Sequence, residues 1–520
     1  MIRYQSSGQL SFFKTPFDQQ LDKTNRWVQL SDQLPWDKLV KIYNNKLRSD
    51  FGAPGIDARK IIGALIIKHK LCLSDREVIE TIRENVYMQY FVGLSSFSTE
   101  AIFHHTEFVY IRKRLSQTDF NLMTEELMSA AGIIEKNSQE KTDDNQDDEP
   151  NQTGVQPVSG EQRADANEEA ATNKGDLKLD ATVADQKIKY PNDVDLLNTG
   201  RQEIDRMIDM LCKELEQKRP RTYRRRARKQ YLLFSKKKNK TFKQIRRARK
   251  EQLGYLKRNL GLLDTLVAKY EQHQMRLPFV HRDLRILWAT RLMRDQQLEM
   301  HINNVHRIEN RIVNLYQPYV RPILRGKAKT KVEFGSKNGV SLQNGYAFID
   351  TLSWDAYNES SDLYKASENY KTRFGYYPEC IIADAIYHTR VNKNYCTQNN
   401  IRLLGKQLTK TVLSKMTARQ KKEHKISHNS RNQIEGKFGQ AKNGYDLNRI
   451  AAKYANTSAS WIGAIYFVMN ILAFAGGSFL AFFKDAFRAF RGIIQQLIIA
   501  MHQKQEEQQQ ICFSLLYVKN

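Results

Sequence analysis

Residues 177–183 read LKLDATV, and this stretch decides the fold because apolar and polar side chains alternate at its start. Alternation with a period of two is typical of a β-strand that has one buried face. The strand carries an acid, Asp180, and Asp176 and Asp185 lie close by as alternative sources of a carboxylate. The sequence therefore predicts a first strand that brings a carboxylate into the fold.

Further strands are predicted well downstream of this first one, after about 130 largely helical residues. They cover residues 330–342, 345–352, 378–384 and 401–405. The first two form a hairpin in which Gln343 and Asn344 separate the runs. The third, PECIIAD, is a short buried strand that ends at Asp384.

The predicted order of elements is strand, helical insertion, hairpin, helix, strand, connection, strand and helices. This order describes a mixed α/β sheet with flanking helices. Its topology suits a ribonuclease H-like core with a large helical insertion after the first strand. Residues 36–130 precede it as an all-α domain of short helices, in which Ser74 and Glu77 make a capping-box start. The helix pair there fits a DNA-binding helix-turn-helix, with a plain helix bundle as the alternative.

The chain is strongly basic, with 83 Lys and Arg against 57 Asp and Glu and a formal net charge of +26. Such an excess attracts polyanions, so nucleic acid is the expected partner, with a membrane surface or plain solubility as alternatives. The basic residues are densest at 218–250, inside the insertion. The candidates for DNA phosphate contacts there are Arg224, Arg225, Arg226, Arg246 and Arg247. A solvated helix face is the alternative for this segment.

One apolar run, residues 461–483, is long enough to span a bilayer and carries no charge. Asn470 lies in its middle and Gly476 and Gly477 interrupt it, which favours a buried helix over a membrane helix. The five scattered cysteines and the N-terminus, which shows no secretory signal, fit a cytoplasmic protein. No nucleotide-binding P-loop pattern is present, so ATP hydrolysis is not indicated.

The third acid lies in SHNSRNQIEGKFGQAKNGYDLNRI, residues 427–450. Arg431, Glu435 and Lys442 are four and then seven residues apart, so a helix would place them on one face. A plain i,i+4 ion pair is the alternative reading of Arg431 with Glu435. Phosphodiester transfer with two divalent cations needs hard oxygen ligands from separate elements, and Asp180, Asp384 and Glu435 supply them.

The chain resembles bacterial insertion-sequence transposases of the DDE type, in the InsH-like, IS-five group. The resemblance is carried in order by residues 57–85, 180–198, 331–359, 379–396 and 431–450. It implies that Asp180, Asp384 and Glu435 form a metal-binding catalytic triad for two Mg²⁺ ions, with Mn²⁺ as a substitute. Arg431 and Lys442 then correspond to the basic members of a Y-R-E-K signature.

Two features depart from the family pattern. His428 stands where a tyrosine is expected to contact DNA, which would make DNA binding sensitive to pH near neutrality. The residues after Asp384 are Ala and Ile, where the family more often has Arg or Gly followed by Gly or Tyr. Both departures concern the fine positioning of the site.

The resemblance implies a cut-and-paste transposase that binds terminal inverted repeats and target DNA and does not bind a membrane. It also implies a homodimer in a synaptic complex, in a cytoplasmic protein that is associated with the nucleoid. A catalytically inactive DNA-binding derivative and a membrane-anchored nucleic-acid-binding protein are the alternatives. The predicted units are an N-terminal helical DNA-binding domain at 1–134, an acidic disordered linker at 135–176, the catalytic core at 177–197 and 328–485, a basic helical insertion at 198–327, and a C-terminal helical tail at 486–520.

Overall fold

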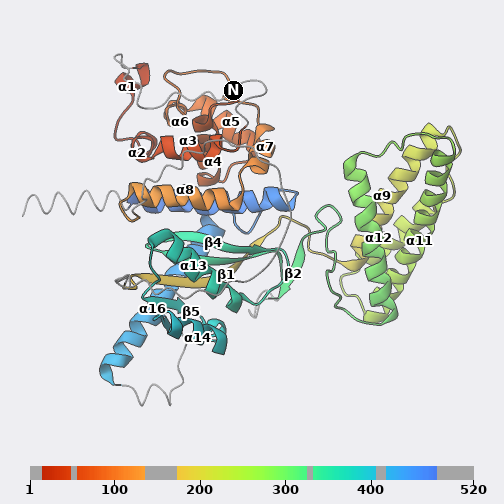
Figure 1. The fold of residues 1–520 in the computed structure, drawn as a ribbon. Coiled ribbons are helices and arrows are strands. Elements are labelled where there is room, and N and C mark those ends of the chain that lie inside the picture. Colours follow the sequence, from red (N-terminus) through yellow and green to blue (C-terminus); the bar gives the residue numbers. More distant parts are fainter. Residues whose placement is uncertain (1–14, 48–54, 135–171, 325–331, 406–416, 477–520) are drawn as a thin grey trace, which may run out of the picture.

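The structure is a computed structural model that describes residues 15–47, 55–134, 172–324, 332–405 and 417–476. Within these residues it has a mixed α/β fold, in which one curled mixed sheet lies among many helices (Figure 1). Most of the predicted acidic linker and the whole predicted tail at 486–520 lie outside the described residues.

The sheet is built around β1 (Asp176–Asp185), the strand that the sequence predicts from its alternating side chains. The others are β2 (Arg321–Leu324), β3 (Val332–Gln343), β4 (Tyr346–Ser353), β5 (Cys380–Ala383) and β6 (Arg402–Leu404). β3 pairs antiparallel with β1, β2 and β4, whereas β5 runs parallel to both β1 and β6. β2 was not predicted from the sequence, because its four residues fall within the predicted helical insertion at 198–327.

The β3–β4 hairpin turns one residue later than predicted. Gln343 is the last residue of β3, and the turn is made by Asn344 and Gly345, whose φ angles are 48° and 86°. A two-residue turn that matches the twist of its strands needs positive φ at both positions, which Asn and Gly tolerate.

The N-terminal helices share a hydrophobic core with the sheet and contact it through α8. They are α1 (Pro16–Gln20), α2 (Arg26–Gln33), α3 (Trp36–Asn44), α4 (Ala58–Lys70), α5 (Asp75–Glu84), α6 (Val86–Phe91), α7 (Glu107–Arg114) and α8 (Gln117–Ala130). The predicted capping box at the start of α5 is confirmed, since Ser74 and Glu77 exchange two hydrogen bonds. The side chains of Gln117 and Asn121 on α8 donate to the carbonyl of Ile349 in β4. One hydrophobic core therefore joins these helices to β3 and β4.

The apolar run forms a helix, Ala455–Gly476, as far as the structure describes it. This helix is long and apolar enough to cross a membrane, but 67% of its most apolar window is buried inside the protein. Its polar residue, Asn470, accepts from the backbone N–H of Ala347 at 2.9 Å and donates to the carbonyl of Ala347 at 2.8 Å. It thereby satisfies backbone groups of the edge strand β4, which supports the buried-helix interpretation.

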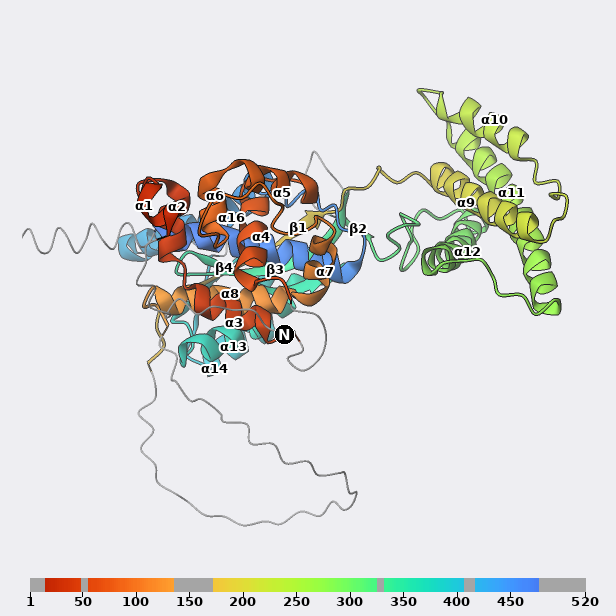
Figure 2. The same ribbon diagram turned by 90° about the horizontal axis from the view of Figure 1, so that it is seen from above.

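The insertion after β1 is a helix bundle. It consists of α9 (Asp193–Glu214), α10 (Arg224–Ser235), α11 (Phe242–Gln272) and α12 (His281–Ile302). α9, α11 and α12 share a core of their own, and α10 packs against α9 and α11 through a smaller cluster around Phe234. Figures 1 and 2 both show this bundle beside the rest of the molecule, joined to it by two chain connections. Leu284, Trp288 and Leu292 lie four residues apart on one face of α12, and that face is exposed to solvent.

Candidate active site

Strand register brings the first two acids together. Leu179 in β1 pairs with Ala383 in the parallel strand β5, so Asp180 and Asp384 each follow one member of this pair. Leu177 and Leu179 are buried on one face of the sheet, and the alternation of a strand turns Asp180 toward the other face. β5 ends at Ala383, and Asp384 caps the short 3-10 helix η2 (Ala385–Tyr387).

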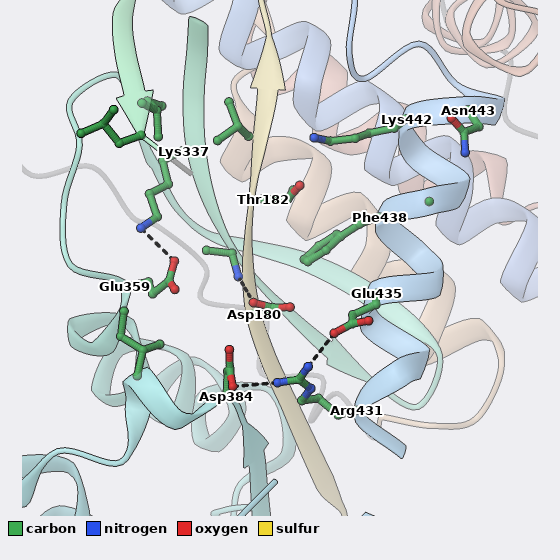
Figure 3. A pocket seen from close by; sticks show the side chains of 16 residues that line it. Asp180, Thr182, Lys337, Glu359, Asp384, Arg431, Glu435, Phe438, Lys442 and Asn443 are labelled. Carbon is green, nitrogen blue, oxygen red and sulfur yellow. Dashed lines mark hydrogen bonds and ion pairs between the residues drawn. The ribbon is translucent and has the colours of Figure 1, made fainter. Parts of the chain in front are cut away.

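The third acid comes from α16 (Ala418–Gly444). Ile434, Phe438 and Ala441 are buried at spacings of four and three residues, and they hold one face of this helix against the core. Glu435 lies on the neighbouring face and reaches the region of Asp180 and Asp384, as Figure 3 shows. Three acids from β1, the end of β5 and α16 thus face one another.

Arg431 links two of these acids. Its Nη2 lies 2.7 Å from Glu435 Oε1, so the i,i+4 ion pair that was the alternative reading of their spacing is present. Its Nη1 lies 2.8 Å from Asp384 Oδ1. The guanidinium therefore bridges a helix and a strand end, which a pair local to one helix would not do (Figure 3).

These groups line a cavity of about 860 Å³. Five of the residues singled out in the sequence are among the sixteen that line it: Asp180, Asp384, Arg431, Glu435 and Lys442. Lys442 Nζ lies 3.6 Å from Glu333 Oε1 on β3. His428 is half-buried on α16, three residues before Arg431, and is not among the described residues that line the cavity. Its contact with DNA stays a prediction.

The cavity perturbs the ionisation of Asp180. Burial raises the pKa of this carboxyl to about 6, and the negative charges of Glu359 and Asp384 add to the increase. The backbone N–H of Ala181, which donates to Asp180 Oδ1 at 2.8 Å, and the cation of Arg431 act in the opposite direction. A carboxyl with a raised pKa inside a cavity marks a candidate functional site.

The sequence did not single out two charged residues of the cavity, Lys337 on β3 and Glu359 at the start of the 3-10 helix η1 (Glu359–Ser361). Glu359 lies just ahead of α13 (Asp362–Phe374), where an acid is an ordinary favourable partner of a helix N-terminus. No local signal distinguishes it from such an acid, because its place in the cavity depends on how the chain packs.

The cavity offers hard carboxylate oxygens, which are the ligands that Mg²⁺ and Mn²⁺ prefer. Among the residues that the structure describes, no group of three His, Cys, Asp or Glu side chains is close enough to hold one ion as it stands. The guanidinium of Arg431 lies between Asp384 and Glu435 and balances their charge there. The chemistry of the donor set fits a divalent cation, and binding one would require Arg431 to give way.

The five arginines predicted to contact DNA lie on the bundle and not around this cavity. Arg225 and Arg226 are exposed on α10, whereas Arg224 is half-buried and its Nη2 lies 2.9 Å from Asp209 Oδ2. On α11, Arg246 donates to Asn304 and Arg247 pairs with Glu251, both at 3.0 Å. Four of the five arginines are thus exposed, which suits phosphate contact, and Arg224 is the exception.

Comparison with known proteins finds two family matches. Residues 15–114 match the transposase domain known as DUF772, and residues 381–474 match the transposase DDE domain. The second match includes Asp384 and Glu435, whereas Asp180 lies outside both. No solved structure matches the chain.

A curated relative is similar over part of its length. It is the uncharacterized protein ORF8 in the nfe locus of Rhizobium meliloti, which is 30% identical over 126 residues. The aligned region covers 24% of this chain and 58% of the relative. The two matches, a transposase domain in the N-terminal helices and a transposase DDE domain around the second and third acids, indicate an insertion-sequence DDE transposase.

Proposed function

We propose that this transposase cuts and rejoins DNA at the cavity, with Asp180, Asp384 and Glu435 as its metal-binding catalytic acids. The observation that carries this proposal is the convergence of the three acids from separate elements on one cavity of about 860 Å³. Each acid alone would be an ordinary strand-end, capping or helix-surface residue. Their common cavity is not explained by any of those roles.

A ribonuclease H-like core is the fold that the strand arrangement best supports. Antiparallel β4, β3 and β1 are followed by parallel β5 and β6, with helices packed on both faces. We assign this core to residues 177–197 and 328–485, interrupted by the basic insertion at 198–327 and preceded by the N-terminal domain at 1–134. The InsH-like subgroup is proposed on the sequence resemblance.

In the proposed reaction, water attacks the phosphodiester at a transposon end, and the freed 3′-hydroxyl then attacks target DNA. Two bound divalent cations, Mg²⁺ or Mn²⁺, would activate the attacking oxygen and stabilise the leaving oxygen. Asp180, Asp384 and Glu435 would hold these cations. Arg431 and Lys442, which both line the cavity, would contact the DNA phosphates that enter it.

The DNA itself would be held over a wider surface. The N-terminal helices and the exposed arginines of the bundle would contact duplex phosphates at the terminal inverted repeats. These arginines are Arg225, Arg226, Arg246 and Arg247. Cutting two ends together requires them to be brought into one complex, so we propose a homodimer. Because its proposed partner is DNA, we propose that the protein is cytoplasmic and associated with the nucleoid.

The test is a cleavage and strand-transfer assay on the element's own terminal repeats with Mg²⁺. Asp180→Asn, Asp384→Asn and Glu435→Gln should each lower both products by about 100-fold or more, because losing even an outer partner of a metal ligand typically costs 10–100-fold. Glu379→Gln is the matched control, since Glu379 pairs with Arg402 outside the cavity. Wild-type activity in the three variants would refute the assignment, and an inactive wild type would favour the DNA-binding derivative.

A further inference from the structure

Lys337 and Glu359 form an ion pair inside the cavity. Lys337 Nζ lies 2.8 Å from Glu359 Oε2, and the two side chains keep only 17% and 19% of their surface exposed. Lys337 Nζ also donates to the carbonyl of Tyr357 at 3.0 Å. Burying both charges this far has a desolvation cost that a surface pair avoids, and an apolar pair of similar size would often be as stable. The location of the pair therefore calls for an explanation.

Figure 3 shows Asp180 between two groups of ion-paired side chains. On one side Arg431 pairs with Glu435 and Asp384, and on the other Lys337 pairs with Glu359. Four carboxylates and two engaged side-chain cations therefore surround the centre of the cavity. Four ionised carboxylates carry four negative charges, which would balance the four positive charges of two divalent cations. Three carboxylates would leave one positive charge of the cations unbalanced.

We propose that Glu359 is a fourth carboxylate of the cation-binding cluster, and that Lys337 is the side-chain cation that balances it until a divalent cation binds. The inference rests on the proposed function, because it adds a residue to the same site. Divalent binding then exchanges Lys337 for the metal at Glu359, as it exchanges Arg431 for the metal at Asp384 and Glu435.

The alternative is a purely structural pair that ties η1 to β3. The two interpretations differ in the sign of one measurement, the affinity of the full-length chain for Mn²⁺ without DNA. Glu359→Gln removes a ligand, so Mn²⁺ should bind about 10-fold more weakly or with fewer ions per chain. Lys337→Met removes a competing cation, so Mn²⁺ should bind about 10-fold more tightly. A structural pair predicts that neither variant changes the affinity, or that both weaken it.

The measurement is a Mn²⁺ titration followed by the electron paramagnetic resonance of the free ion, with thermal unfolding recorded for each variant. Glu379→Gln and Arg402→Met are the matched pair outside the cavity and should leave the affinity unchanged. If Glu359→Gln does not fold, Lys337→Met decides the question alone: tighter binding supports the exchange, and unchanged or weaker binding overturns it. Glu359→Asp keeps the carboxylate and should retain part of the affinity that the Gln variant loses.

Asp384→Asn separates this inference from the function on which it rests. If Asp384→Asn weakens Mn²⁺ binding and Glu359→Gln does not, the three-acid site stands and the fourth carboxylate is refuted. If Asp384→Asn binds Mn²⁺ as the wild type does, the proposed cation site itself fails and the role of Glu359 falls with it.

Discussion

Asp180 in β1 and Asp384 just beyond the end of β5 occupy matching places on neighbouring parallel chain segments, because each directly follows one residue of the Leu179–Ala383 pair. A shift of one residue in this register would turn the side chains of β1 to the opposite faces and separate the two acids. The register is held by burial, since Leu177, Leu179, Ile381 and Ala383 all belong to one core. The acids are therefore positioned by packing on the far side of the sheet.

The ionisation of Asp180 makes a prediction about stability and pH. Its pKa rises from 3.8 to about 6 on folding, so the folded chain holds this proton more tightly than the unfolded chain does. The free energy of unfolding should therefore fall as pH rises from about 4 to about 6, and the loss should be complete above pH 6. Asp180→Asn should lack this loss and be more stable than the wild type at pH 7 by up to about 3 kcal/mol.

Urea unfolding without divalent cations, measured from pH 4 to pH 8, tests this expectation. The two stability curves should converge near pH 4 and separate as pH rises. Glu379→Gln, at an exposed site, provides the reference profile. Parallel curves for wild type and Asp180→Asn across the whole range would show that Asp180 does not titrate as described.

Arg431 should matter most when no metal is bound. Arg431→Met leaves Asp384 and Glu435 without their shared cation, so stability in the presence of a chelator should fall by about 1 kcal/mol, as expected for partly exposed ion pairs. Mg²⁺ should restore most of this loss, because binding to the folded state stabilises it. Thermal unfolding with and without Mg²⁺ measures both effects. Arg402→Met should show no such restoration, and an equal response of the two variants to Mg²⁺ would contradict the prediction.

Local sequence patterns were sufficient to predict most of the strands and helices that carry the three acids. Alternation in residues 177–183 predicted β1, the apolar run before Asp384 predicted β5, and helical spacing predicted that Arg431 and Glu435 lie on one face of a helix. These features depend on neighbours a few residues apart, which a sequence displays directly.

Very short elements and features that depend on distant segments were not predicted. β2 is only four residues long and contains Pro322, so its sequence shows no strand pattern, although it pairs with the nearby strand β3. The Lys337–Glu359 pair joins residues 22 positions apart through the β3–β4 hairpin, and the bridge from Arg431 to Asp384 spans 47 positions. Their residue types are common in solvated faces and helix starts, so only the packed structure assigns them to the cavity.

Asn470 should be one of the most sensitive polar residues of the core. Asn470→Leu would leave the N–H and carbonyl of Ala347 buried without their present partner, at an expected cost of about 2–4 kcal/mol. Urea unfolding measures this loss. Asn432→Leu on the exposed side of α16 is the control and should change stability by less than about 0.5 kcal/mol. A loss as small for Asn470→Leu would mean that the edge of β4 is satisfied in another way.

The two apolar faces of α12 should respond differently to truncation. Met293 is fully buried in the bundle core, whereas Trp288 on the other face is 56% exposed. Met293→Ala should therefore cost about 2–5 kcal/mol, because it removes buried surface and leaves a cavity. Trp288→Ala should cost about 0.5 kcal/mol or less, despite the larger side chain. Urea unfolding of the full chain at low protein concentration measures both. A cost for Trp288→Ala that equals or exceeds that for Met293→Ala would show that the outer face of α12 is covered in solution.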